Sequence, residues 1–409
     1  MIIKNISFGL VSSISRLFLG LAIFTVLTRY LSIEEFGNYS YLLTITGYLT
    51  IVIDFGFNYS SLNELPNKKE LLKNIFYETI FSKTILTVFS LTVMLLLLVI
   101  IPSFKYSVEL FLFALIAIIF SYSTYISQVF KAHNKFEIEL IFVLTNNLLP
   151  LIIIFLFREN ISLTSIAFIL LFSRLIGLLF LSLKFKFHFN EKKINKSLKF
   201  NFSTINKNWK YSIHMILGSV FISSDILIMK NILGYNGIAI YSAGVKILMS
   251  LLMIGEVVNT SFIPKLSEYY NSSNQLFKIN AKRLFFIISI LSIICSAGIF
   301  LVGKFIITLV FGDKYYELIP LLPYFSILVI VRFMAIFFGT IVTLFEKQKY
   351  RAYTVIFILP IHFFLNTHLQ EKMGISGALI SMLISFSIIT IINILLTLKY
   401  YPKTNQLQK

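Results

Sequence analysis

Acidic residues are scarce in this chain of 409 residues, and so is charge in general. The chain has 18 Asp and Glu residues against 36 Lys and Arg residues, and charged residues make up only 13% of the total. An ordinary soluble domain has about 25% charged residues, because charged side chains cover its surface. The composition therefore excludes a typical soluble protein.

Cysteine and the usual catalytic motifs are also missing. The single cysteine, Cys295, excludes a disulfide framework and a cysteine metal site. The sequence has no Gly-rich phosphate loop, no nucleophile elbow and no helical metal motif with two histidines. The segments between the apolar runs are too short for the large external loops that membrane glycosyltransferases and polysaccharide polymerases usually display. We therefore expect no enzyme, no cofactor and no direct use of ATP.

Long apolar runs, in contrast, fill most of the chain. Hydrophobic residues make up 57% of the sequence, and the mean hydropathy is +0.86. About 20 apolar residues are enough to cross a bilayer as a helix, and continuous runs indicate helices rather than barrel strands. The first run lacks a small-residue cleavage site and is expected to be a retained span. We predict an all-α integral membrane protein with about twelve spans, at roughly 5–30, 36–60, 76–101, 108–130, 139–157, 162–185, 209–232, 238–262, 284–306, 318–345, 351–369 and 374–399.

One long polar connection divides these spans into six and six. We expect an N-terminal six-helix bundle at 1–190, a basic cytoplasmic linker at 191–208 and a C-terminal six-helix bundle at 209–409. A faint internal repeat with a shift of 202 residues places Tyr39 over Tyr241 and Asp54 over Glu256. Because transporters are commonly built from such repeats, we favour a duplicated chain.

The distribution of Lys and Arg predicts the orientation in the membrane. Loops on one side contain 24 of these residues, loops on the other side contain 7, and 5 lie inside spans. By the positive-inside rule, both termini are expected to be cytoplasmic. The basic linker is explained by the same rule and by attraction to anionic headgroups. The alternative is a docking site for a partner enzyme, and no nucleic-acid partner is expected.

Several charges lie within the predicted spans, where a charge is costly and usually faces protein or water. They comprise five cations and three acids, namely Arg16, Lys83, Arg174, Lys246 and Arg332, and Asp54, Asp225 and Glu256. The surplus of positive charge predicts a water-filled cationic cavity for an anionic substrate such as a phosphate or diphosphate. Arginine binds these groups in a bidentate manner.

These charges also admit other interpretations. In one alternative they pair with one another and only hold helices together. In another, the long side chain of Lys83 snorkels, so that its ammonium group reaches the cytoplasmic interface. Burial disfavours the charged form of a carboxylate. Asp54, Asp225 and Glu256 are therefore candidate sites for a coupling ion, H⁺ or Na⁺.

Short motifs in both halves of the chain resemble a known family. They are Arg16 followed by LTRYLS at 27–32, EFGNY at 35–39, DFGF at 54–57 and GDKYY at 312–316. These motifs, the twelve spans and the basic central loop resemble bacterial polysaccharide transporters. Those are the O-antigen (Wzx-type) flippases of the multidrug/oligosaccharidyl-lipid/polysaccharide (MOP) superfamily.

The resemblance implies a two-bundle, MATE-like transporter in the bacterial inner membrane. Its expected substrate is an undecaprenyl-diphosphate-linked repeat unit of O-antigen (lipopolysaccharide), capsule or exopolysaccharide, moved from the cytoplasmic to the periplasmic leaflet by alternating access. The five cations are then expected to attract the diphosphate, and a polysaccharide polymerase and chain-length machinery are the expected partners. The rival functions are a multidrug or toxin exporter of the same superfamily and a membrane-embedded glycan-processing enzyme. The surplus of cations argues against the exporter, since such exporters usually bind cations.

Overall fold

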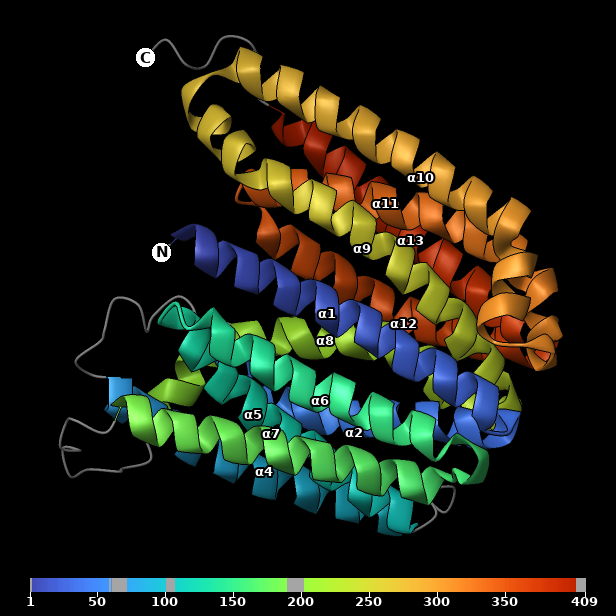
Figure 1. The fold of residues 1–409 in the computed structure, drawn as a ribbon. Helices are drawn as coiled ribbons and strands as arrows, with labels where there is room; N and C mark the ends of the chain where they lie inside the picture. The colour runs from blue at the N-terminus through green and yellow to red at the C-terminus, as the bar shows by residue number, and fades with distance from the viewer. Residues whose placement is uncertain (1, 59, 61–71, 101–106, 190–201, 402–409) are drawn as a thin grey trace. The chain divides into compact units, whose positions relative to one another are not determined.

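Nearly all the residues that the structure describes belong to long α-helices (Figure 1). The structure is a computed structural model and describes residues 2–58, 60, 72–100, 107–189 and 202–401. Within these ranges the first six long helices are α1 (Ile2–Tyr30), α2 (Ile33–Asp54), α4 (Leu72–Ile100), α5 (Val108–Ala132), α6 (Phe136–Leu156) and α7 (Leu163–Phe189). The other six are α8 (Phe202–Ile232), α9 (Gly234–Ser272), α10 (Asn274–Val310), α11 (Leu322–Leu344), α12 (Gln348–Met373) and α13 (Ile375–Tyr400).

Each of these helices corresponds to one predicted span, so the prediction of an all-α membrane protein is confirmed. Eleven of the helices in the described ranges are long and apolar enough to cross a membrane. The remaining one is α2, which contains Glu34, Glu35 and Asp54. Two short 3₁₀ helices, η3 (Arg158–Asn160) and η4 (Asp313–Leu321), lie between longer helices.

The chain folds as two compact units, residues 1–219 and 220–409. The boundary lies inside α8, which begins at Phe202. The predicted basic linker at 191–208 falls mostly on residues 190–201, outside the described residues, and its last part is the start of α8.

Helix ends follow from local sequence signals. Ser32 and Glu35 form a capping box at the start of α2, because each side chain bonds the other residue's backbone N–H. Ser107 caps α5 by accepting a hydrogen bond from the backbone N–H of Leu110. Gly234, the first residue of α9, has φ of +66°, a conformation that favours glycine.

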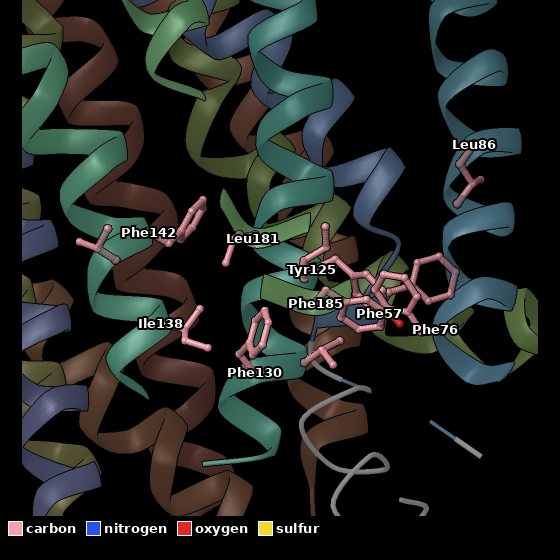
Figure 2. Packing of buried hydrophobic residues seen from close by; sticks show 12 residues of the cluster. Phe57, Phe76, Leu86, Tyr125, Phe130, Ile138, Phe142, Leu181 and Phe185 are labelled. Atoms are coloured by element: carbon pink, nitrogen blue, oxygen red, sulfur yellow. The ribbon is translucent and has the colours of Figure 1, made fainter. Parts of the chain in front are cut away.

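An aromatic cluster forms the core of the N-terminal unit. In Figure 2, Phe57, Phe76, Tyr125 and Phe185 lie together. The rings of Phe76 and Phe185 stack with their centroids 4.0 Å apart, and Phe76 also stacks on Tyr125. These contacts join α4, α5 and α7.

Glycines allow close helix packing in the C-terminal unit. A Cβ atom on Gly244 of α9 would lie 2.3 Å from the Phe325 ring of α11, and one on Gly255 would lie 2.8 Å from the Phe333 ring. Small residues of this kind let membrane helices approach one another. α9 therefore packs tightly along α11.

α9 and α10 form an antiparallel hairpin that is longer than a bilayer requires (Figure 1). They contain 39 and 37 residues. At about 1.5 Å per residue, each helix is about 55–60 Å long, against about 30 Å for the hydrocarbon core. The connection between them is the single residue Ser273, which caps α10. The tip of the hairpin therefore extends beyond the apolar region.

Candidate functional site

Arg16 of α1 forms an ion pair with Glu139 of α6. The Arg16 Nη2 to Glu139 Oε1 distance is 3.1 Å, and Lys131 Nζ lies 2.6 Å from the same oxygen. The Glu139 side chain is only 2% exposed, whereas that of Arg16 is 49% exposed. A buried carboxylate is thus held by two cations, and about half of the Arg16 side chain remains exposed.

Lys83 of α4 is completely buried and faces Asp54. Its Nζ lies 3.4 Å from Asp54 Oδ1 and donates a hydrogen bond of 2.9 Å to Ser121 Oγ. The same ammonium lies over the rings of Tyr122 and Tyr125, at 5.8 and 5.6 Å from their centroids. The aromatic faces add favourable contacts to a cation that has no exposed surface.

Arg174 of α7 contacts neutral groups. Its Nη1 donates a hydrogen bond of 2.8 Å to Asn146 Oδ1 of α6, and its guanidinium lies 4.4 Å from the centroid of the Phe120 ring. Gly177, one turn further on, makes room for this amide, because a Cβ there would lie 2.3 Å from Asn146 Nδ2. Arg16 is close enough to Arg174 for their charges to interact. The two arginines therefore concentrate positive charge beside α6.

In the C-terminal unit, Asp225 of α8 lies at the centre of a buried polar cluster. The Tyr241 hydroxyl and the Asn366 side-chain amide each donate a hydrogen bond to its carboxylate. His362 Nε2 lies 3.3 Å from Asp225 Oδ1. Gln370 Nε2 donates to the Asp225 carbonyl oxygen at 3.3 Å and to Asn366 Oδ1 at 2.7 Å.

The cluster extends to α13 through His362. Its Nδ1 lies 2.9 Å from Ser385 Oγ and 3.2 Å from Ser381 Oγ. Its ring also packs against Phe221, with centroids 4.6 Å apart. The imidazole therefore links α8, α12 and α13.

The other predicted residues of this unit lie on α9 and α11. The Arg332 guanidinium lies 3.9 Å from the centroid of the Phe386 ring, and the charge of Glu256 acts on it. The Glu256 side chain is exposed and that of Lys246 is half-buried. Glu256 and Asp54, which the internal repeat aligns, therefore have different environments.

The structure thus brings six of the eight sequence-predicted charges together in pairs, and it places Asp225 among groups outside the predicted set. Lys83 joins Asp54, Arg16 lies near Arg174, and Arg332 lies near Glu256. Sequence reasoning missed several buried partners of these charges, namely Glu139, Asn146, Tyr241, Asn366 and Gln370.

Two sequence signals could have identified some of these partners. His362, Asn366 and Gln370 are four residues apart, so they form a polar stripe along α12. Ser381 and Ser385 repeat this spacing on α13. Metal ligation is a separate matter, and the described residues contain no group of three or more His, Cys, Asp or Glu that could hold a metal ion.

Comparison with known proteins gives a family match and several similar folds. A family model described as "Polysaccharide biosynthesis protein" matches residues 2–270. The inward-facing conformation of a multidrug resistance MATE family transporter of the MOP superfamily has a TM-score of 0.70, 12% identity and 94% coverage of both chains. The outward-facing conformation of such a transporter has a TM-score of 0.63, 12% identity, and coverage of 97% of this chain and 95% of that chain. These likenesses identify a MATE-like fold, and a comparison with curated protein sequences finds no match.

Proposed function

Because this chain belongs to the polysaccharide biosynthesis protein family, we propose that it is a flippase for lipid-linked oligosaccharides. Its substrates are undecaprenyl-diphosphate-linked repeat units of O-antigen, capsule or exopolysaccharide. It moves them from the cytoplasmic to the periplasmic leaflet of the bacterial inner membrane, driven by an ion gradient. The family match, joined to a transporter fold, is the observation on which this proposal depends.

Alternating access is the proposed mode of transport. The matched MATE transporters are described in inward-facing and outward-facing conformations. We extend this pair of states to the present chain as part of the proposal. The proposal includes a cytoplasmic location for both termini, which the excess of Lys and Arg in the loops on one side supports.

The diphosphate is assigned to the arginines of the N-terminal unit first. Arg16 is half exposed and has room for a further partner. Arg174 has no carboxylate within ion-pair distance among the described residues, so its charge is not neutralised locally. A diphosphate accepts the paired N–H donors of arginine in a fixed geometry. Lys83, Lys246 and Arg332 are assigned a supporting role in the attraction of the anionic headgroup.

The test is surface-glycan production in a strain that lacks the gene. Deletion should abolish the glycan and leave lipid-linked repeat units on the cytoplasmic face of the membrane. Wild type and a Lys304→Ala variant, altered at an exposed lysine of α10, should both restore the glycan. Arg16→Ala and Arg174→Ala, at matched expression, should not restore it. Normal glycan in the deletion strain would refute the flippase.

Two other outcomes identify the rival functions. Drug sensitivity of the deletion strain with intact glycan would favour a multidrug exporter. Formation of a new glycan product by the purified protein would favour an enzyme. The likeness to a multidrug transporter does not favour an exporter over a flippase, because 12% identity establishes the fold alone. The transporter fold does not favour an enzyme either.

A further inference from the structure

The polar cluster around Asp225 lies apart in sequence from the arginines assigned to the diphosphate, and its side chains are almost fully buried. Asp225, His362 and Tyr241 are each 1% exposed, and Asn366 is 0% exposed. We infer that Asp225 and His362 together form a proton-binding site, in which His362 Nε2 takes up one proton while Asp225 stays ionised. This proton is the coupling cation of the transport cycle, so its role, though not its binding, rests on the proposed function.

The charge balance of the cluster requires a cation. The two other buried acids of the predicted spans both have cations beside them. Asp54 has Lys83 at 3.4 Å, and Glu139 has Arg16 at 3.1 Å and Lys131 at 2.6 Å. Among the described residues that contact the Asp225 carboxylate, namely Tyr241, Asn366 and His362, only the imidazole of His362 can become positive. With a neutral imidazole the buried site has a net charge of −1. An uncompensated charge in a buried site is costly. One proton on His362 brings the pair to a net charge of zero.

The donors around Asp225 suit a proton better than a metal cation. Tyr241 and Asn366 present an O–H and an N–H group to the carboxylate. The oxygen of the Asn366 amide already accepts a hydrogen bond from Gln370 Nε2. Hard metal cations need several oxygen ligands, whereas this carboxylate is surrounded by hydrogen-bond donors. These donors also stabilise the ionised form of Asp225, which places the proton on the imidazole.

No other contacting group competes for this role in the described residues. α9 contributes Tyr241, and α13 contributes the uncharged Ser381, Ser385 and Met382. From α11, Arg332 acts on the Tyr241 hydroxyl through its charge, and its guanidinium lies on the Phe386 ring. Arg332 thus adds positive charge at a distance and makes no direct contact with Asp225.

Proton binding changes the links between three helices. A neutral imidazole donates from one ring nitrogen, and an imidazolium donates from both. In the structure His362 Nε2 lies 3.3 Å from Asp225 Oδ1 without forming a hydrogen bond to it. When His362 is protonated, we expect Nε2 to donate to Asp225 while Nδ1 donates to Ser385, which lies 2.9 Å away. The first of these is a charge-assisted hydrogen bond, which is stronger than a neutral one. Loss of the proton therefore weakens the connection of α12 to α8 or to α13.

The test is a titration of His362 in the full-length protein in lipid nanodiscs, without any glycan substrate. The chain has five histidines, and their ring nitrogens are labelled with ¹⁵N for nuclear magnetic resonance. A His362→Gln variant identifies the His362 signal. We expect this signal to convert from imidazole to imidazolium with the uptake of one proton.

Three variants test whether the proton affinity of His362 depends on Asp225 and on the donors around it. Asp225→Asn should lower the proton affinity of His362 at least tenfold, because the charged partner is lost. Tyr241→Phe should raise it, because Asp225 loses a donor that stabilises its charge. Asp54→Asn, the matched control in the N-terminal unit, should change it less than twofold. A merely structural role for the cluster does not predict shifts in opposite directions.

Several results would overturn the inference. The first is a His362 that stays neutral at every pH, and the second is an Asp225→Asn variant that titrates like wild type. The third is a proton affinity that falls when Na⁺ replaces K⁺ in the buffer, provided that this effect disappears in Asp225→Asn, because Na⁺ would then be the cation that Asp225 binds. If Asp225→Asn does not fold, Tyr241→Phe decides alone, and an unchanged or lower affinity contradicts the proposal. A normal titration in a protein that transports no lipid-linked glycan would refute the proposed function and leave the proton site standing.

Discussion

At the scale of single residues, the buried ion pair of Lys83 and Asp54 predicts a strong dependence of stability on charge balance. Lys83→Met leaves Asp54 buried without a cation, which should lower the free energy of unfolding by about 3–5 kcal/mol. The double variant Lys83→Met with Asp54→Leu should recover most of this loss. Thermal unfolding of the purified protein in detergent measures both. Equal stability of the single and double variants would contradict a structural ion pair.

Removal of the Glu139 charge is expected to strengthen substrate binding. Because Glu139 competes with an anionic ligand for Arg16, Glu139→Gln should tighten the binding of undecaprenyl diphosphate in nanodiscs several-fold. A charged hydrogen bond is worth about 1.5–3 kcal/mol. Half of this energy, no longer spent on the Arg16–Glu139 pair, is enough for a several-fold gain in affinity. Glu137→Gln, on the same helix, serves as the control. Weaker binding in the Glu139 variant would show that the carboxylate positions Arg16 for the ligand.

Of the charges that the sequence placed inside spans, Lys83, Asp54 and Asp225 are buried, whereas Glu256 is exposed. The sequence did not predict the partners of these charges. Arg16 and Lys83 stand out because they interrupt apolar runs. Glu139 looks like an ordinary acid in the first turn of a helix, and only the fold shows that α1 brings Arg16 to it. Pairing depends on distances between helices that are far apart in the chain, and a single sequence does not contain those distances.

At the scale of helices, the contact of α6 with α7 depends on Gly177. In Gly177→Ala, the new Cβ would lie 2.3 Å from Asn146 Nδ2, so the amide must move away from Arg174. We expect a loss of about 1–3 kcal/mol in the free energy of unfolding, as for other overpacked sites. The matched control is Gly47→Ala, since a Cβ there meets no atom within 4 Å. Thermal unfolding of both variants in detergent checks this, and equal stability of the two would contradict the packing argument.

The tip of the α9–α10 hairpin predicts the sidedness of the protein. In a Cys295→Ser background, a cysteine in place of the exposed Glu268 of α9 should react with a membrane-impermeant reagent only from the cytoplasmic side. A cysteine in place of Lys304 of α10 should react only from the periplasmic side. The opposite pattern would reverse the orientation that the Lys and Arg distribution predicts.

Hydropathy predicted the existence of all twelve long helices in the described part of the chain, but it did not predict the full length of α9 and α10. The predicted spans ended near residue 262 and began near 284, where Lys and Asn become frequent. The structure continues α9 to Ser272 and starts α10 at Asn274. A helix satisfies its own backbone hydrogen bonds in water as well as in lipid, so the end of an apolar run does not have to be the end of a helix.

At the scale of the whole molecule, the helix boundaries agree with a duplicated chain. The last residues of α1 and α8, Tyr30 and Ile232, are 202 positions apart, which is the shift of the sequence repeat. The first residues of α2 and α9, Ile33 and Gly234, are 201 positions apart. The agreement of boundaries supports the repeat better than the few identical residues do.

The position of α8 predicts where the chain tolerates a break. Fragments 1–195 and 196–409, expressed together, keep α8 whole and should restore glycan production in the deletion strain. Fragments 1–219 and 220–409 follow the boundary between the compact units but cut α8. They should fail, because one exposed helix end on each side of the cut leaves unpaired backbone groups in the membrane. Restoration by both pairs would contradict this dependence on an intact α8.

The single-residue turn at Ser273 also makes the long hairpin a place for an experimental marker. α9 ends and α10 begins directly beside Ser273. A rigid helical protein inserted at this turn can therefore continue both helices without a flexible linker. Such a marker gives single-particle images of this 47.1 kDa chain a feature outside the detergent by which to align them.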